Sequence, residues 1–263
     1  MREVARALVY LPQMALGLKR IFHNRYLDRL ALSRLPVRFH ALYKLFRYDT
    51  YDSERVSMMH RAATWLSVNG VTGSVCEFGC AGGESFLNLY LQFARIFSPT
   101  PHFFLFDSFE GLPEPDDKTA HAAWKKGTYR MDRDLFVQRM DFFRVPRSAY
   151  TITKGFYQES LLTQTARTLP IGPLALLHID CDFYESTLLA LEFVTKNLQD
   201  GSIVLFDDYY CSKGNPSLGE SGAFLQWLSS HLDWSAVPWY DYSIHGKAFV
   251  LSRIVQDAIA PRS

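Results

Sequence analysis

Two pairs of aspartates in the second half of the chain have the residue types and the spacing needed to hold a metal ion. Asp180 and Asp182 come directly after one apolar run. Asp207 and Asp208 come directly after another, Ser202–Phe206. If the two runs are neighbouring parallel strands, four carboxylates meet at one edge of a sheet. Like charges that close repel one another strongly, so the arrangement indicates a site for a divalent cation with oxygen ligands.

The spacing of Asp180 and Asp182 also predicts the direction in which their side chains point. Side chains two positions apart on an extended segment share a side, so we expect both to face this edge. Without a metal, the clustered anions should destabilise the fold, so removing one of them should raise thermal stability in metal-free buffer.

A glycine-rich turn earlier in the chain indicates a second binding site. A short strand ends in Glu77 and is followed by Gly79, Gly82 and Gly83. This pattern differs from the dinucleotide fingerprint, in which a helix N-terminus receives a pyrophosphate. A carboxylate beside glycines that admit a ligand suits a cationic or hydroxyl-bearing molecule better than a phosphate. The pattern therefore favours S-adenosylmethionine over NAD.

Asp107 is the next acidic residue at a strand end. It follows the apolar run His102–Phe106, about two dozen residues beyond the glycine turn. An acidic residue at this point commonly binds ribose hydroxyls in nucleotide-binding sheets. The alternative is that Asp107 caps a helix.

Alternating strand and helix patterns must position these residues. The pattern predicts strands ending at Glu77, Phe106, Thr153, Ile179 and Phe206, and a closing pair at 237–239 and 247–251. It also predicts a helix that Asp52 or Ser53 caps and that runs through 58–68, and helices at 85–97, 131–143, 186–198 and 223–232. This order is typical of a Rossmann-like three-layer α/β sandwich with a mostly parallel sheet. The aromatic residues Trp124, Tyr129, Tyr209, Tyr210, Trp239 and Tyr240 either stack on a ligand or belong to the core.

Residues 1–50 are predicted to form a basic, N-terminal helical extension to a domain at 51–263. We expect the first helix to be amphipathic and to dock on the domain or on a partner subunit, which allows a homo-oligomer. Attachment to an anionic membrane surface is the alternative. No apolar run is long enough to span a bilayer.

The composition is that of an ordinary globular protein. The 263 residues are 48% hydrophobic and 21% charged, and a net charge of +1 gives no reason to expect nucleic-acid binding. The four cysteines lack metal-site spacing, and we interpret them as reduced thiols of a cytoplasmic protein.

Taken in order, five motifs resemble the macrocin O-methyltransferase (TylF-like) family, which methylates sugar hydroxyls on macrolide and aminocoumarin antibiotics. The resemblance covers roughly Tyr51 to Leu251. The motifs are Glu77-x-Gly79-x-x-Gly82-Gly83, the Asp107–Pro113 string, Gly155-Phe156-x-x-x-Ser160-Leu161, Asp180-x-Asp182-x-Tyr184-Glu185-Ser186-Thr187, and Asp207-Asp208-Tyr209. The chain departs from the family at Gly219–Glu220–Ser221, where Gly-Ala-Arg is frequent, and this leaves the acceptor open.

The resemblance implies a class I S-adenosylmethionine-dependent methyltransferase that needs Mg²⁺. It assigns Asp180, Asp207 and Asp208 to the metal and makes Asp182 the general base. The candidate cofactor-binding residues are Glu77, Gly79, Gly83, Ser85, Asp107, Ser108, Gly155 and Phe156. The expected acceptor is a hydroxyl of a sugar or glycoside, with a vicinal diol favoured and a catechol-like group as an alternative.

Two other functions fit part of the sequence. A metal-dependent glycosyltransferase would use Asp180-x-Asp182 to bind a nucleotide-sugar, but it leaves the glycine turn and the Asp207–Asp208 pair unexplained. A catalytically inactive methyltransferase fold would serve as a binding subunit, although all four carboxylates are retained.

Overall fold

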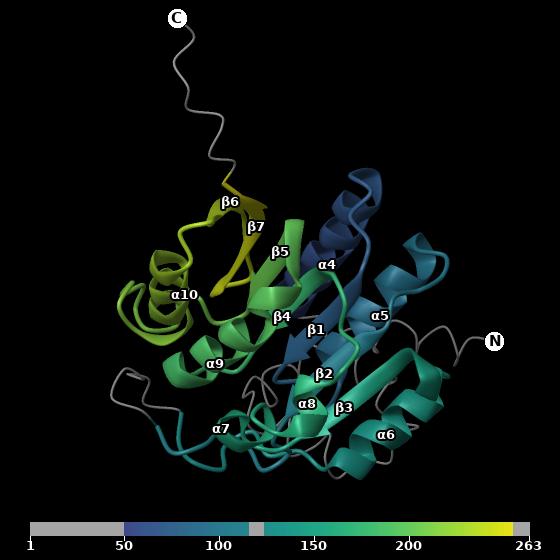
Figure 1. The fold of residues 1–263 in the computed structure, drawn as a ribbon. Helices are drawn as coiled ribbons and strands as arrows, with labels where there is room; N and C mark the ends of the chain where they lie inside the picture. Colours follow the sequence, from purple (N-terminus) through teal and green to yellow (C-terminus); the bar gives the residue numbers. More distant parts are fainter. Residues whose placement is uncertain (1–49, 116–123, 255–263) are drawn as a thin grey trace, which may run out of the picture.

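The computed structural model describes residues 50–115 and 124–254, so the predicted N-terminal helical extension lies outside the described residues. Within them the chain forms a seven-stranded sheet in the order β3-β2-β1-β4-β5-β7-β6 (Figure 1). The strands are β1 (Ser74–Phe78), β2 (Phe103–Asp107), β3 (Tyr150–Lys154), β4 (Leu174–Ile179), β5 (Leu198–Phe206), β6 (Trp234–Tyr242) and β7 (Gly246–Arg253). Strands β1 to β5 pair in parallel, while β7 runs antiparallel to both β5 and β6. The predicted mostly parallel sheet is confirmed.

Helices cover both faces of the sheet, as the alternating pattern predicts (Figure 1). They are α4 (Thr50–Val68), α5 (Glu84–Ile96), α6 (Arg133–Phe142), α7 (Tyr157–Ser160), α8 (Gln164–Arg167), α9 (Tyr184–Val194) and α10 (Gly219–Ser230). Helices α4, α5 and α6 contribute to the hydrophobic core on one face. Helices α7, α9 and α10 contribute to the core on the other. The result is the predicted three-layer α/β arrangement.

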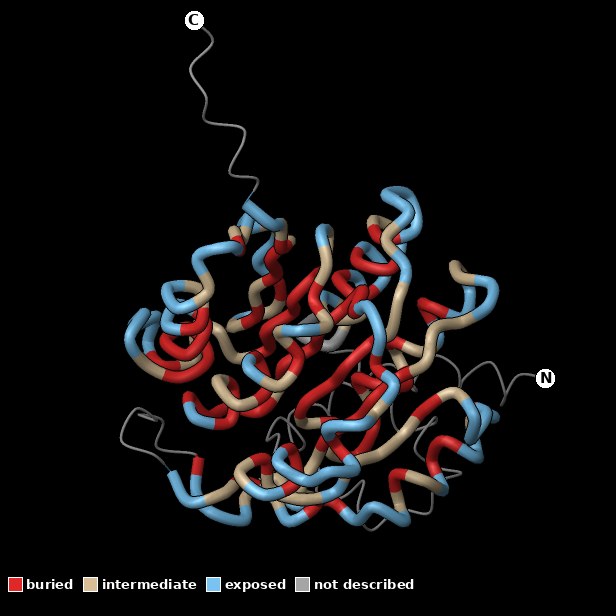
Figure 2. The backbone as a smooth tube through the Cα atoms, in the orientation of Figure 1, coloured by how far each residue is buried: buried red, intermediate tan, exposed pale blue. Residues whose placement is uncertain are grey.

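The central strands bury side chains on both faces, which explains their apolar sequences. In Figure 2 the strands form the most continuously buried stretch, and every residue of β4 is buried. Successive residues of β1 alternate between the two cores, with Val75 on the α4 face and Cys76 on the α9 face. A buried charge on such a strand therefore requires a partner, which matters for Glu77.

Helix α4 begins at Thr50, two or three residues before the predicted cap at Asp52 or Ser53. Its first core residues are Met58 and Met59. The preceding turns contain Arg55, which makes ionic contacts instead. None of the helices among the described residues is long and apolar enough to cross a membrane.

Candidate active site

Backbone hydrogen bonds align the ends of the four central strands. Gly79 donates to the carbonyl of Phe106, Asp180 to that of Phe78, and Asp207 to that of Ile179, each at 2.9 Å. The residues that follow β1, β2, β4 and β5 therefore lie along one edge. This is where open α/β sheets bind their ligands.

Three of the predicted carboxylates gather at this edge. Oxygens of Asp180, Asp207 and Asp208 lie within 4.8 Å of one another, with Asp207 buried and the other two partly exposed. These are the three residues to which a metal was assigned from the family resemblance. Asp182, the fourth, is not in the group. Oxygen donors at this spacing fit a hard divalent cation such as Mg²⁺.

A guanidinium lies directly against the cluster. Arg55 Nη2 is 3.0 Å from Asp180 Oδ2, and Arg55 Nε is 3.0 Å from Asp207 Oδ1. Only 17% of the arginine side chain is exposed, against 5% for Asp207. The anions are thus partly neutralised by the protein itself. The sequence-based expectation that removing any one anion raises stability does not take this arginine into account, and for Asp180 and Asp207 the loss of the contact opposes it.

Glu220 is a further carboxyl group behind the cluster. It is fully buried near the start of α10, and its Oε2 accepts a hydrogen bond from the Asp208 N–H at 3.0 Å. Its Oε1 has no hydrogen-bond partner among the described residues. Burial and then the Asp208 carboxylate raise the pKa of Glu220 well above its usual range, against the effect of the Asp208 N–H bond.

That raised pKa leads to a pH-dependent expectation for Glu220→Gln. The folded wild-type protein holds a proton that an unfolded carboxyl, with its usual pKa of about 4.5, releases. Wild-type stability therefore falls as pH rises above that value, whereas the glutamine variant has no such loss. In chelator at pH 8 we expect the variant to melt at least about 2 °C higher, with the difference vanishing below about pH 4.5.

Thermal unfolding between pH 4 and 9 measures this difference. Glu159→Gln, at an exposed position of α7, is the control and should show no such trend. A difference for Glu220→Gln that does not change with pH would contradict the assignment of a protonated carboxyl.

The glycine turn packs against the protein itself. A Cβ on Gly79, at φ 92°, would lie 1.8 Å from the backbone oxygen of Asp180. A Cβ on Gly83, at φ 77°, would lie 2.6 Å from the ring of Phe136 in α6. The sequence interpretation reserved these positions for a ligand. The structure shows an additional reason why glycine is required at both positions, which is close packing in a left-handed backbone conformation.

Gly79→Ala is therefore expected to damage the fold as well as the site. We expect it to lower the free energy of unfolding by more than about 3 kcal/mol, since the backbone of Asp180 cannot move aside cheaply. Gly70→Ala is the matched control, because Gly70 has φ 69° but no described atom within 4 Å of its Cβ position. It should cost only about 1 kcal/mol for the left-handed backbone. Equal urea midpoints for the two variants would refute the packing argument.

Asp107 holds the glycine turn in place. Its Oδ2 accepts a hydrogen bond from the Ala81 N–H, and its Oδ1 accepts one from the Phe109 N–H, both at 2.6 Å. Burial raises its pKa, although these two bonds act in the opposite direction. Asp107 thus binds the glycine turn and its own loop, and the helix-capping alternative does not apply. Each oxygen still has a lone pair for a ligand hydroxyl.

The other candidate cofactor residues lie close to these two loops. Ser85 is buried in the first turn of α5, and Ser108 Oγ donates to the Gly111 carbonyl at 2.8 Å. Gly155 donates to the Asp107 carbonyl at 3.0 Å, and Phe156 precedes α7. All of them therefore follow β1, β2 or β3, at the edge that contains the acidic cluster. Their contact with a cofactor stays a prediction.

Glu77 lies deeper than a ligand-binding carboxylate would. It is fully buried, and its Oε1 is 3.1 Å from Nδ1 of His178, its neighbour on β4. Burial lowers the pKa of His178, but the hydrogen bond and the charge of Glu77 outweigh that effect and raise it overall. Glu77 Oε2 has no partner among the described residues. The structure thus assigns Glu77 to an internal pair, and a role in cofactor binding rests on the remaining oxygen.

Asp182 occupies a tight turn instead of the extended segment expected from the sequence. Its φ is 66°, and the Phe183 N–H donates to the Cys181 carbonyl at 2.7 Å. The argument from alternating side chains therefore does not hold for Asp180 and Asp182. Asp tolerates a left-handed conformation better than most residues, although such a turn is strained. Strain of this kind is characteristic of functional positions.

A small aromatic cluster fixes this turn. Phe183 packs with Leu112 and Trp124, and Tyr129 lies against them. Trp124 is therefore mainly a packing residue, at 5% exposure. Of the other aromatic residues, Trp239 packs on Trp65 of α4, while Tyr210, Tyr240 and Tyr209 contact Asp241, Arg61 and Phe249 respectively.

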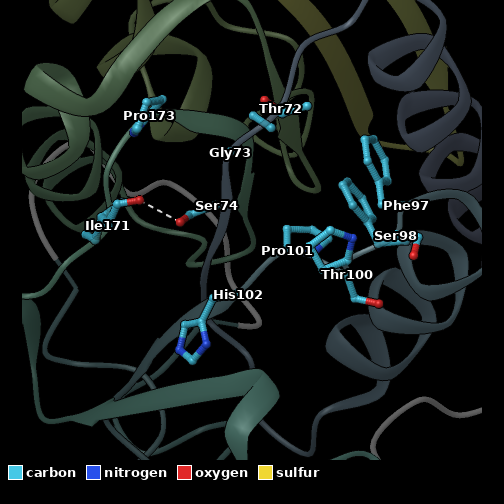
Figure 3. A pocket seen from close by; sticks show the side chains of 13 residues that line it. Thr72, Gly73, Ser74, Phe97, Ser98, Thr100, Pro101, His102, Ile171 and Pro173 are labelled. Carbon is cyan, nitrogen blue, oxygen red and sulfur yellow. Dashed lines mark hydrogen bonds between the residues drawn. The ribbon is translucent and has the colours of Figure 1, made fainter.

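A separate cavity of about 330 Å³ lies at the opposite edge of the sheet (Figure 3). Its lining includes Gly73, His102 and Pro173, which precede β1, β2 and β4. Ser74 donates to the Ile171 carbonyl beside it. No charged aspartate or glutamate lines it, so it offers none of the chemistry of the acidic edge.

Sequence reasoning missed Arg55, His178 and Glu220. Arg55 precedes Met58 and Met59 by three and four positions, so it shares their buried face, and a charge on an apolar face is a readable signal. His178 sits in an uninterrupted apolar strand, where a polar residue needs a partner. Glu220 coincides with the departure from the family pattern.

The sequence of this chain is similar to that of a known protein family. The model of a family described as macrocin-O-methyltransferase (TylF) matches residues 45–220, which is more than half of the chain. A Streptomyces olivaceus enzyme, 8-demethyl-8-(2,3-dimethoxy-alpha-L-rhamnosyl)-tetracenomycin-C 4'-O-methyltransferase, is 27% identical over 168 residues. That alignment covers 59% of this chain and 60% of the relative.

Solved structures share the fold. The calicheamicin methyltransferase CalS11 superposes with a TM-score of 0.64 at 21% identity, covering 86% of this chain and 90% of that one. The O-methyltransferase NovP gives 0.60 at 17% identity, covering 76% and 80%. The strand order, the Rossmann-like layers and these likenesses establish a class I methyltransferase fold. The chain belongs to the macrocin-O-methyltransferase family.

Proposed function

We propose that this protein is an Mg²⁺-dependent O-methyltransferase that transfers a methyl group from S-adenosylmethionine to a hydroxyl of a sugar or glycosylated natural product. The observation that carries the proposal is the meeting of two sites at one edge of the sheet. The glycine turn with Asp107 lies at the ends of β1 and β2, and the acidic cluster lies beside it at the ends of β4 and β5.

The donor would be held by the loops after β1, β2 and β3. S-adenosylmethionine supplies an electrophilic methyl group on a sulfonium. Asp107 is already fixed by two backbone amides, so its free lone pairs are oriented toward ribose hydroxyls without further ordering. The glycines at 79, 82 and 83 let the turn pack closely against neighbouring elements, since a Cβ at any of them would lie less than 3 Å from a neighbouring atom.

The acceptor would lie at the carboxylates. Mg²⁺ held by Asp180, Asp207 and Asp208 would lower the pKa of an acceptor hydroxyl and fix its oxygen. The fit of these residues to a cation is supported by the guanidinium that already contacts two of them. Asp182 would accept the hydroxyl proton, held in place by its tight turn and by the aromatic cluster beneath it.

The choice of a sugar acceptor draws on relatives. The Streptomyces olivaceus enzyme is described as acting on a rhamnosyl tetracenomycin, and an apo structure of CalS11 is described as a TDP-rhamnose 3'-O-methyltransferase. For this chain the substrate class is part of the proposal. A cytoplasmic location and oligomerisation through residues 1–50 remain predictions.

Methyl transfer from labelled S-adenosylmethionine to a panel of sugar nucleotides and glycosides tests the proposal. We expect transfer to at least one acceptor with Mg²⁺, and calorimetric binding of S-adenosylmethionine in the absence of acceptor. Binding of a nucleotide-sugar donor without binding of S-adenosylmethionine would instead indicate the glycosyltransferase alternative. Cofactor binding with no transfer to any acceptor class, with or without metal, would support the inactive binding subunit.

A further inference from the structure

Arg55 has a position that the proposed chemistry does not require. It reaches from the second turn of α4 to the ends of β4 and β5, which are distant in sequence. One edge of its guanidinium contacts two different carboxylates, with Nη2 on Asp180 and Nε on Asp207. Both carboxylates are expected metal ligands. An arginine that only stabilised the fold would more simply pair with one of them.

We propose that Arg55 is a resident counter-ion of the acidic cluster, and that a divalent cation binds by displacing its guanidinium from Asp180 and Asp207. This inference rests on the proposed metal site. It concerns how that site is kept in the metal-free protein and how tightly it binds the metal.

Charge supports the exchange. Three carboxylates with oxygens within 4.8 Å of one another repel, and the guanidinium supplies one positive charge that offsets part of this repulsion. A divalent cation at the same oxygens would face repulsion from that charge, because the contacts are only 3.0 Å long. The two cations therefore compete for the same anions.

The geometry supports it as well. A charge-assisted hydrogen bond from Arg55 occupies one oxygen of Asp180, and an ion-pair contact with Arg55 Nε occupies one oxygen of Asp207. The Arg55 side chain is 17% exposed, so solvent reaches part of it. The long arginine side chain can leave the cluster by rotation, without movement of the helix.

The consequence is a reduced apparent affinity for the metal. If the metal binds only when the guanidinium is displaced, its apparent affinity is the intrinsic affinity multiplied by the fraction of molecules in the displaced state. If about one molecule in ten is in that state, Arg55→Gln should bind Mg²⁺ about tenfold more tightly than the wild type. The same variant should melt at a lower temperature in chelator, since the carboxylates lose their counter-ion.

Two measurements test this role of Arg55. They are calorimetric titration with Mg²⁺, and thermal unfolding in chelator and in saturating Mg²⁺. We expect tighter binding and a larger metal-induced rise in melting temperature for Arg55→Gln. Arg55→Lys keeps the charge but lacks the planar guanidinium fork that contacts both carboxylates, so its Mg²⁺ affinity should fall between those of the wild type and Arg55→Gln. Arg61→Gln is the matched control, since it removes the same charge from the same helix at a residue that contacts Tyr240, and its Mg²⁺ affinity should stay within about twofold of the wild type.

The results separate this inference from the proposed function. Equal or weaker Mg²⁺ binding by Arg55→Gln and Arg55→Lys, with the wild type binding the metal, would overturn the role of Arg55 alone. If neither the wild type nor the variants bound Mg²⁺, the metal site and this inference would both be wrong. Should Arg55→Gln not fold, Arg55→Lys carries the same comparison.

Discussion

Asp182→Asn is expected to bind S-adenosylmethionine and Mg²⁺ nearly as the wild type does, and to turn over roughly 10²–10⁴-fold more slowly. That loss is the usual contribution of a general base. Asparagine preserves the size of the side chain and, like aspartate, tolerates the φ of 66° found at this position. It cannot accept the acceptor proton. The substitution therefore removes the chemistry and leaves the turn.

Steady-state turnover as a function of Mg²⁺ concentration checks this prediction. Asp182→Ala is the companion variant, because alanine adds backbone strain in the left-handed region as well as removing the carboxylate. It should melt at a lower temperature than Asp182→Asn. If Asp182→Asn regained full turnover merely at higher Mg²⁺, Asp182 would be a metal ligand and the base would lie elsewhere.

Asp207→Asn should instead weaken the metal site itself. Asp207 is the most buried of the three clustered carboxylates, so no exposed group can easily replace it. We expect Mg²⁺ affinity to fall at least about 100-fold, because changes even to groups that only support metal ligands cost 10–100-fold. Wild-type turnover should likewise stop in excess chelator and return when Mg²⁺ is added.

Isothermal titration with Mg²⁺ and turnover at several metal concentrations measure these effects. Asp233→Asn is the control, since Asp233 precedes β6 and forms an exposed ion pair with Arg253. It should leave both quantities unchanged. Turnover that persisted after exhaustive metal removal would mean that the three carboxylates serve another purpose.

Local patterns predicted a mostly parallel sheet and the acidic cluster at its edge. Apolar runs ending in acidic residues predicted β4 and β5, and their parallel pairing brought Asp180 and Asp207 together as expected. These features depend on residues that are adjacent in sequence. The period of apolar residues and the identity of the residue after a strand are both local signals.

The interactions that sequence reasoning missed join residues far apart in the chain. Arg55 and Asp180 are separated by 125 positions, and Glu77 and His178 by 101. The pairing of a particular charge with a particular carboxylate depends on tertiary packing, which local periodicity does not encode. The turn at Asp182 was missed for another reason. Aspartate tolerates this conformation, but the presence of an aspartate does not predict it. The turn is held by Phe183 and its aromatic neighbours.

The contact between Gly79 and the Asp180 backbone bears on how such a protein can diversify. Because no side chain fits between the two loops, neither can gain or lose a residue without the other changing too. Insertions and deletions that alter the acceptor should therefore accumulate in the segments 124–130 and 211–218, which do not share this contact. New specificities would arise around an edge whose spacing stays fixed.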